Sequence, residues 1–490
     1  MQRIQTPYKL CLSRQVRLLR FVSQNSRSIR TFDEHAPIAS SYSNSSGHVE
    51  SDLSNATSKQ GSNPKIRIQV RVSQKPSVEN APVSEPESPV HKPKSLASDL
   101  KKQKEKQKPT LQDFNSYIES NIGSYNHITS FSDLPLEFGY NQHISIDNEL
   151  RERLRSILWK FNAPIKYAFA YGSGVFSQGK PVDASQRQVD LIFGVSYTEH
   201  WHSLNMRQNP HHYSALRYLG SGAISTIQDK FGAGVYFNPY VEIDGIKIKY
   251  GVVNMDTMLT DLHKWSSLFV AGRLQKPVKI LRDEPRARFV NQTNLISALR
   301  TALLLLPETF SELDLYKTIA GNSYRGDPRM MLGENPNKVN NIVNNQFLNF
   351  RNLYSPLLDV LPNVNMAHSS AFKLENTEIP VASMKQDMDP VTRGNMVHRL
   401  PLDFRQNLYV RYQSKLESSN LDETEFGDNL HGTLFDQQIA ADPNLSDNVS
   451  KAIKSTVFGP SLGESIKGVF TAGFGRSLRY AFDKLQKNNL

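Results

Sequence analysis

The fold is decided by Tyr171-Gly172-Ser173-Gly174-Val175-Phe176 together with the later stretch Val189-Asp190-Leu191-Ile192-Phe193. The apolar run 167–171 predicts a strand that ends in a Gly-Ser-Gly turn, and an aspartate then opens a second apolar run. Glycines in such a turn let backbone N–H groups and a hydroxyl approach a phosphate chain closely. A strand aspartate can hold the Mg²⁺ that neutralises this chain. The order of turn and carboxylate is therefore typical of nucleotidyl transfer.

Spacing alone leaves simpler interpretations open. A Gly-Ser-Gly sequence after an apolar run is often only a turn. A single aspartate at a strand edge is often a solvated residue. A second acid two positions later is also missing, because Ile192 stands there. If the site is real, one metal ion is a better prediction than two.

Six sequence blocks carry a wider signal from about Ser130 to the C-terminus. They are Tyr171-Gly172-Ser173-Gly174-Val175-Phe176, Trp201-His202-Ser203-Leu204-Asn205, Phe231-Gly232-Ala233-Gly234-Val235-Tyr236, Ile248-Lys249-Tyr250-Gly251-Val252, Ala271-Gly272-Arg273-Leu274-Gln275-Lys276-Pro277-Val278-Lys279 and Phe470-Thr471-Ala472-Gly473. In this order they resemble the mitochondrial translocator assembly and maintenance family, the mitochondrial phosphatidate cytidylyltransferases (CDP-diacylglycerol synthases). The resemblance does not extend to the first hundred or so residues.

The resemblance implies an α+β fold with a nucleotidyltransferase-type mixed sheet core, a helical, winged-helix-like second domain and a C-terminal amphipathic helix. It implies a Mg²⁺-dependent reaction of CTP with phosphatidic acid that gives CDP-diacylglycerol and pyrophosphate for cardiolipin synthesis. Two other hypotheses remain: a mitochondrial RNA nucleotidyltransferase, and a non-enzymatic factor that maintains the protein translocase. Against RNA, the chain has neither paired strand acids nor an interleaved aromatic and basic surface, so no nucleic-acid partner is expected.

The candidate site begins with the glycine turn. Gly172, Ser173 and Gly174 are predicted to hold the β- and γ-phosphates of CTP, and Asp190 is the first choice for the metal. The family's motif has a further acid seven positions earlier, which corresponds to Asp183. A weak metal or phosphate-loop role is assigned to it, with an exposed loop acid as the alternative.

Three basic residues complete the predicted site. Lys249 lies in a predicted strand where nucleotidyltransferases often carry a third carboxylate, so it either contacts a phosphate or faces solvent. The resemblance implies that Arg273 and Lys276 bind the nucleotide. From the sequence pattern alone, a basic surface loop is the expected alternative. Cations after a glycine turn suit a triphosphate or a phosphatidate headgroup. Residues 324–329 form either a loop on the substrate side or a type I turn. His202 is expected to serve in polar packing.

The composition and the N-terminal residues bear on where in the cell the protein is located. The 490 residues carry a net charge of +11 and 38% hydrophobic residues, which favours anionic partners and a partly disordered chain. Residues 1–32 are rich in arginine and serine and contain no acid, as in a mitochondrial presequence. The only cysteine, Cys11, lies within them. No apolar stretch reaches the roughly twenty residues that span a bilayer. Together with these features, the family resemblance implies a peripheral protein on the anionic matrix side of the inner membrane.

The domain boundaries follow from changes in composition. Residues 33–109 are predicted to be a disordered linker, 110–290 the catalytic domain, 291–360 the helical domain, 361–463 an extension with a polar, loop-like segment at 363–389, and 464–490 the membrane-contact helix. Strands are predicted over 167–171, 190–196, 235–238, 240–243, 247–253 and 278–281. Helices are predicted over 111–125, 148–161, 209–230, 256–269, 294–306, 311–320, 338–354, 434–442 and 449–457, and the tail 464–485 has amphipathic helical spacing.

Overall fold

The computed structural model describes residues 118, 125–176, 188–331, 335–361, 363–374, 377, 379–413 and 432–473. All of them belong to the unit Lys92–Leu490. The predicted presequence, the whole of the predicted linker, almost all of the predicted helix 111–125, Asp183, and residues 474–490 of the predicted membrane-contact helix lie outside the described residues.

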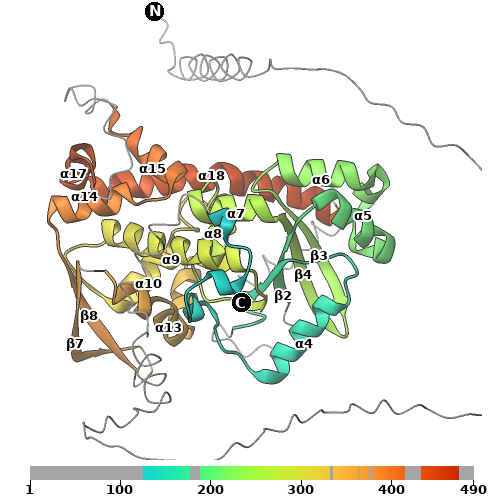
Figure 1. Ribbon diagram of the computed structural model, residues 1–490, viewed down its shortest axis with the longest axis horizontal. Coiled ribbons are helices and arrows are strands. Elements are labelled where there is room, and N and C mark those ends of the chain that lie inside the picture. The colour runs from blue at the N-terminus through green and yellow to red at the C-terminus, as the bar shows by residue number, and fades with distance from the viewer. Residues whose placement is uncertain are drawn as a thin grey trace, which may run out of the picture. The chain divides into compact units, whose positions relative to one another are not determined.

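A five-stranded mixed sheet has the strand order β3-β4-β2-β1-β5 (Figure 1). The strands are β1 (Tyr167–Tyr171), β2 (Val189–Val195), β3 (Val235–Ile243), β4 (Ile246–Asn254) and β5 (Lys279–Arg282). Strands β2 and β4 are parallel, and the other neighbours are antiparallel. With the helices described below, this sheet confirms the predicted α+β class.

The β3–β4 hairpin forms where the sequence predicts it. Asp244 and Gly245 have φ angles of 50° and 75°, which a two-residue hairpin turn requires. The two strands predicted on either side of Pro239 are one strand, β3, whose pairing register shifts between Asn238 and Val241. A proline is tolerated there because β3 is an edge strand.

Helices pack around the sheet. They are α4 (Asn148–Trp159), α5 (Thr198–Gln208), α6 (Gly220–Lys230), α7 (Met255–Lys264), α8 (Ala271–Leu274) and α9 (Pro285–Leu305). Helix α9 begins nine residues before its predicted start, because Glu284 caps it by accepting a hydrogen bond from the amide of Ala287. Helix α7 ends before the predicted residue 269. Trp265 adopts a left-handed conformation. The Asp261 carboxylate then accepts hydrogen bonds from the backbone amides of Ser267, Val270 and Ala271.

A second region carries more helices and a small sheet. Its helices are α10 (Glu312–Gly321), α11 (Pro328–Met331), α12 (Lys338–Asn345), α13 (Phe347–Leu358), α14 (Pro390–His398), α15 (Leu402–Tyr409), α17 (Leu434–Ala440) and α18 (Leu445–Ala472). Its strands are β6 (Thr309–Ser311), β7 (Val364–Lys373) and β8 (Pro380–Gln386), in the order β6-β8-β7.

The prediction of a polar loop over 363–389 is therefore wrong. The segment forms β7 and β8, which pair antiparallel. In β8 only Val381 and Met384 are deeply buried apolar residues, which is too few to give a strand pattern in the sequence. Polar groups anchor the hairpin instead: the Gln386 amide donates to the carbonyls of Leu303, Leu306 and Pro307.

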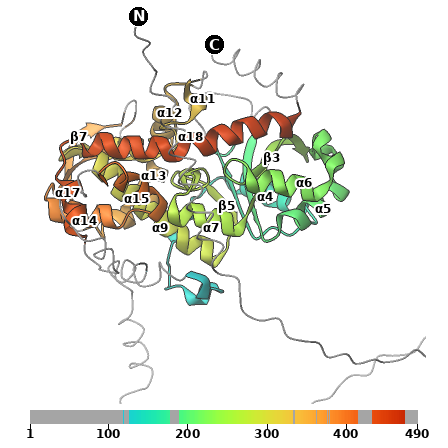
Figure 2. The ribbon, with the colours of Figure 1, turned by 90° about the horizontal axis from the view of Figure 1, so that it is seen from above.

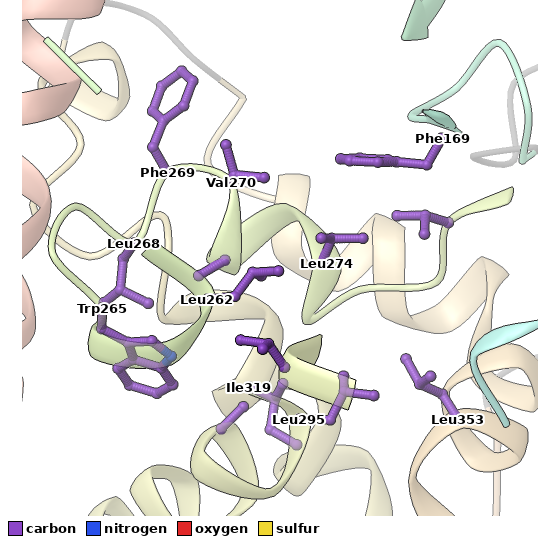
Figure 3. Packing of buried hydrophobic residues seen from close by; sticks show 14 of the residues in the cluster. Phe169, Leu262, Trp265, Leu268, Phe269, Val270, Leu274, Leu295, Ile319 and Leu353 are labelled. Carbon is purple, nitrogen blue, oxygen red and sulfur yellow. The ribbon is translucent and has the colours of Figure 1, made fainter. Parts of the chain in front are cut away.

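One hydrophobic core joins the large sheet to the second region. Figure 3 shows Phe169 of β1, Leu274 of α8, Leu295 of α9, Ile319 of α10 and Leu353 of α13 within the same cluster. Two predicted boundaries fall inside helices, at 290/291 in α9 and at 463/464 in α18. The shared core fixes α8 and the turn after α10 relative to β1 and β2.

Helix α18 runs along both regions. It contacts β3 at one end and α15 towards the other, with α9 beside it (Figure 2). Among the helices that the structure describes, none has both the length and the apolar character needed to cross a membrane.

Candidate active site

The glycine turn lies directly against the Asp190 carboxylate. Strands β1 and β2 pair so that Tyr171 is opposite Asp190, and the chain turns at Gly172 with φ of 81°. A Cβ on Gly172 would lie 3.3 Å from Asp190 Oδ2. A Cβ on Gly174 would lie 2.4 Å from the Gln188 carbonyl oxygen, so this position also excludes a side chain. Ser173, between them, is exposed.

Lys249 stands beside Asp190 on the neighbouring strand. The parallel pairing of β2 and β4 sets Asp190 against Lys249. The Lys249 ammonium lies 4.6 Å from the centre of the Phe237 ring. Burial raises the pKa of Asp190, while the charges of Lys249, Arg273 and Lys338 oppose this shift. The acid is thus surrounded by cations from different elements.

Helix α8 and the segment just after it supply the next two cations, Arg273 and Lys276. The Arg273 guanidinium lies 3.8 Å from the Phe269 ring centre, and its Nε is 3.2 Å from the Tyr171 hydroxyl. The Lys276 ammonium donates to the Gly272 carbonyl and, at 2.8 Å, to Ser323 Oγ. Burial, assisted by the nearby Arg273 and Lys338 charges, lowers the pKa of Lys276 to about 7. The charges of Arg273 and Lys338 therefore act on both Lys276 and Asp190.

Sequence reasoning missed Lys338 altogether. It lies at the start of α12, far along the chain from every motif, and only the tertiary fold brings it near Asp190 and Lys276. The segment 324–329 reaches this site as well. The Tyr324 ring contacts the ammonium groups of Lys276 and Lys338, and Arg329 pairs with Asp327 at 2.6 Å. In the sequence, the arginine-containing turn Tyr324–Arg329 pointed to a segment on the substrate side. No sequence pattern pointed to Lys338.

His202 has a packing environment, as predicted. Its Nδ1 lies 2.9 Å from the Tyr213 hydroxyl and its Nε2 lies 2.8 Å from Gln228 Oε1. Burial lowers the pKa of His202 to about 4, so the ring is neutral. The same network includes Asn205 and Tyr250. These hydrogen bonds hold α5 and α6 against β4.

The donor set at Asp190 suits a particular kind of metal site. Within the described ranges, no three His, Cys, Asp or Glu side chains come together to enclose an ion. Mg²⁺ commonly keeps several waters and binds through one or two carboxylates plus the phosphates of a substrate. Asp190, under an open glycine turn and beside cations that suit phosphates, fits this pattern. It does not fit a cage built from protein ligands alone.

Similarity to known proteins identifies the family of the chain. Residues 154–487 match the family model described as "Phosphatidate cytidylyltransferase, mitochondrial". The chain is 46% identical over 260 residues to the mitochondrial phosphatidate cytidylyltransferase of Saccharomyces cerevisiae, covering 52% of this chain and 67% of that protein. It is 39% identical to the proteins of the same name from Schizosaccharomyces pombe, covering 71% of this chain and 87% of the relative, and from Mus musculus, covering 68% and 94%. The chain belongs to the mitochondrial phosphatidate cytidylyltransferase family.

Proposed function

We propose that this protein transfers a cytidylyl group from CTP to phosphatidic acid, giving CDP-diacylglycerol and pyrophosphate for cardiolipin synthesis. The observation that carries the proposal is the half-buried acid Asp190, which lies against the Gly172 turn and is surrounded by Lys249, Arg273 and Lys338. The relatives described above are named for this activity. CTP, rather than another nucleotide, is inferred from those names.

The reaction depends more on neutralising the negative charge of the phosphates than on a general base. An oxygen of the lipid phosphate attacks the α-phosphorus of CTP and forms a new P–O bond. The bond from that phosphorus to the bridging oxygen of the β-phosphate breaks, and pyrophosphate departs with the electron pair. The attacking phosphate is already an anion, so no strong general base is required. Arg273, Lys276 and Lys249 would reduce the repulsion between the anions and stabilise charge on the leaving group.

Mg²⁺ is part of the proposal. Asp190 would hold it, with Asp183 as a second candidate ligand. When bound, the ion neutralises negative charge on the triphosphate. Gly172, Ser173 and Gly174 would bind the β- and γ-phosphates through their amides and the Ser173 hydroxyl. The exposed position of Ser173 and the absence of side chains beside it support this role.

We propose finer fold assignments on similar grounds. A nucleotidyltransferase-type core is supported by the mixed sheet, in which an acid on β2 follows the turn after β1. A winged-helix-like region is supported by the three-stranded antiparallel sheet β6-β8-β7 and the helices around it.

A peripheral position on the matrix side of the inner membrane completes the proposal. Helix α18 carries an exposed apolar stripe, defined here as Phe458, Leu462, Ile466, Val469 and Phe470. These residues recur at helical spacing, and the opposite face of the helix packs on β3. A helix of this kind binds a membrane surface by burying its apolar residues at the headgroup boundary, with attraction to anionic lipids.

One assay tests the function. The purified mature protein is incubated with radiolabelled CTP, Mg²⁺ and either phosphatidate liposomes or RNA. Label in the lipid phase that depends on Mg²⁺ is the expected result. Label in RNA instead would indicate an RNA nucleotidyltransferase. Label in neither, from protein that thermal unfolding shows to be intact, would contradict enzymatic transfer and favour a maintenance factor.

A further inference from the structure

An aromatic ring at the edge of the site is shared by two lysines. The ammonium groups of Lys276 and Lys338 lie 5.3 and 5.4 Å from the centre of the Tyr324 ring. At these distances each charge is attracted to the ring by a cation–π interaction. The three side chains come from the second residue after α8, the turn after α10 and the first residue of α12. One ring therefore brings together two like charges from distant parts of the chain.

The turn that carries Tyr324 is fixed on both sides. A Cβ on Gly272 of α8 would lie only 2.3 Å from Ser323 Cβ, so α8 and this turn touch. On the other side, a Cβ on Gly326 would lie 2.7 Å from the Cα of Lys454 in α18, and Arg325 donates to Ser450 Oγ at 3.3 Å. A binding group is most effective when its supporting contacts hold it in place beforehand. The Tyr324 ring meets this condition.

Bringing these positive charges close together is unfavourable, and a bound anion would offset their repulsion. The hydrogen-bond acceptors of Lys276 are the Gly272 carbonyl and the Ser323 hydroxyl, and neither carries a charge. Arg273 and Lys338 both act to lower the pKa of Lys276, which shows that the positive charges repel one another. A phosphate oxyanion placed among them would replace this repulsion with attraction and accept charge-assisted hydrogen bonds.

We infer that Lys276, Tyr324 and Lys338 form a phosphate-binding corner through which the second region of the protein takes part in binding substrate. The inference rests on the proposed function, because it adds residues to that same site. The ligand is a phosphate oxyanion. It belongs either to the β- and γ-phosphates of CTP or to the headgroup of phosphatidate. In either case Lys338 binds the ligand directly, and Tyr324 positions both ammonium groups.

Pyrophosphate binding and steady-state kinetics test the corner together. Calorimetry on the full-length protein gives the Kd for inorganic pyrophosphate, and activity on phosphatidate liposomes gives KM values for both substrates. The variants are Lys338→Met, Tyr324→Leu and Tyr324→Phe, the last of which keeps the ring. The control is Lys385→Met, because Lys385 is 67% exposed in the same region and pairs with Glu308 at 3.0 Å. Thermal unfolding shows whether each variant is folded.

The outcomes separate the two sources of phosphate. If the corner binds the triphosphate, Lys338→Met and Tyr324→Leu weaken pyrophosphate binding and raise the KM for CTP by about tenfold or more. If it binds the lipid headgroup, pyrophosphate binding is unchanged and the KM for phosphatidate rises by a similar factor. In both cases Lys385→Met resembles the wild type, and Tyr324→Phe, which keeps the ring, is affected less than Tyr324→Leu.

Other results overturn the inference. If neither KM nor the pyrophosphate Kd of folded Lys338→Met and Tyr324→Leu changes beyond about twofold, the lysines and the ring serve packing only. The same conclusion follows if Tyr324→Phe is as damaging as Tyr324→Leu. An inactive wild-type protein would instead remove the proposed function, while its pyrophosphate Kd values would still decide whether the corner binds an anion.

Discussion

Glu464 and Lys467, one turn apart in α18, form a buried ion pair of 2.7 Å that fastens this helix to the start of β3. Glu464 Oε1 also accepts from the amides of Ala233 and Val235, and Lys467 donates to the Phe231 carbonyl. Burial raises the pKa of Glu464 and lowers that of Lys467. The pair therefore depends on each partner to offset the loss of water around the other.

Removing one partner should be costly. Lys467→Met leaves the Glu464 carboxylate buried without its counter-ion, so we expect the free energy of unfolding to fall by about 3 kcal/mol or more. The double variant Glu464→Gln, Lys467→Met should recover part of this loss, because no buried charge remains. Urea denaturation measures both values.

An exposed pair in the same helix is the matched control. Lys451 and Asp447 lie 2.5 Å apart with more than half of each side chain exposed. Lys451→Met should change the free energy of unfolding by less than about 1 kcal/mol, because solvent screens exposed pairs. Equal losses for Lys467→Met and Lys451→Met would contradict the role given to the buried pair.

Gly272 should not tolerate a side chain. Its added Cβ would meet Ser323 Cβ at 2.3 Å, which would push apart α8 and the turn that carries Tyr324. We expect Gly272→Ala to lower the free energy of unfolding by about 1–3 kcal/mol and to reduce turnover as Lys276 shifts. Thermal unfolding and the CTP assay measure the two effects.

Gly468 provides the comparison for that variant. It lies within α18, and a Cβ there meets nothing within 4 Å. Gly468→Ala should therefore stabilise the protein by roughly 0.5–1 kcal/mol, as expected for a helix interior. A Gly272→Ala protein with wild-type stability and turnover would show that the close approach of Ser323 is not a constraint.

The sequence predicted the local elements of the site and not its full extent. Strand β1 and the hairpin at Asp244–Gly245 follow from short patterns, because a short apolar run and turn chemistry are encoded by neighbouring residues. Asp190 and Gly172 could be paired for the same reason, since they flank one β-connection. Lys338 could not be found, because its place depends on how α12 packs against α10 and α13.

The errors have similar causes. The hairpin β7–β8 was missed, and in β8 only Val381 and Met384 are buried apolar residues, which is too few to show an alternation. Helix α7 was extended too far because Leu268 and Phe269 continue its apolar spacing. The Asp261 carboxylate overrides that pattern by binding the amides of the following turn. In both cases a polar side chain that hydrogen-bonds to backbone groups decides the structure, and the apolar pattern of the sequence does not carry this information.

Asp190→Asn should abolish turnover and preserve the fold. The substitution keeps the shape of the side chain and removes the charge, and with it the predicted metal ligand. We expect kcat to fall by at least about a hundredfold. Stability should be equal or higher, since burial already raises the pKa of Asp190 and the charged form is costly. Asp359→Asn, at an exposed position, is the control. Turnover within a few-fold of the wild type would remove Asp190 from the mechanism.

The pKa of Lys276 predicts that anion binding depends on pH. Its pKa of about 7 means that it is charged below that pH and neutral above it. Pyrophosphate affinity should therefore fall as the pH rises through about 7, in addition to the titration of pyrophosphate itself. Lys276→Arg keeps its charge and should not lose affinity in this range, so the difference between the two proteins isolates the lysine. Calorimetry from about pH 6 to 9 gives the two curves. Parallel curves would contradict a titrating Lys276.

The apolar stripe of α18 should determine membrane binding. Ile466 and Phe470 are exposed on the face that does not pack on β3, so replacing both with glutamate adds like charge next to anionic lipid without disturbing the core. We expect Ile466→Glu, Phe470→Glu to reduce cosedimentation with liposomes rich in phosphatidate by about tenfold or more, since each buried apolar side chain contributes on the order of 1–2 kcal/mol. The same double change at Leu348 and Val410, which are exposed outside the stripe, serves as the charge-matched control. If both proteins sediment like the wild type, α18 does not bind the membrane through this stripe; if both are released equally, net charge rather than the stripe governs binding.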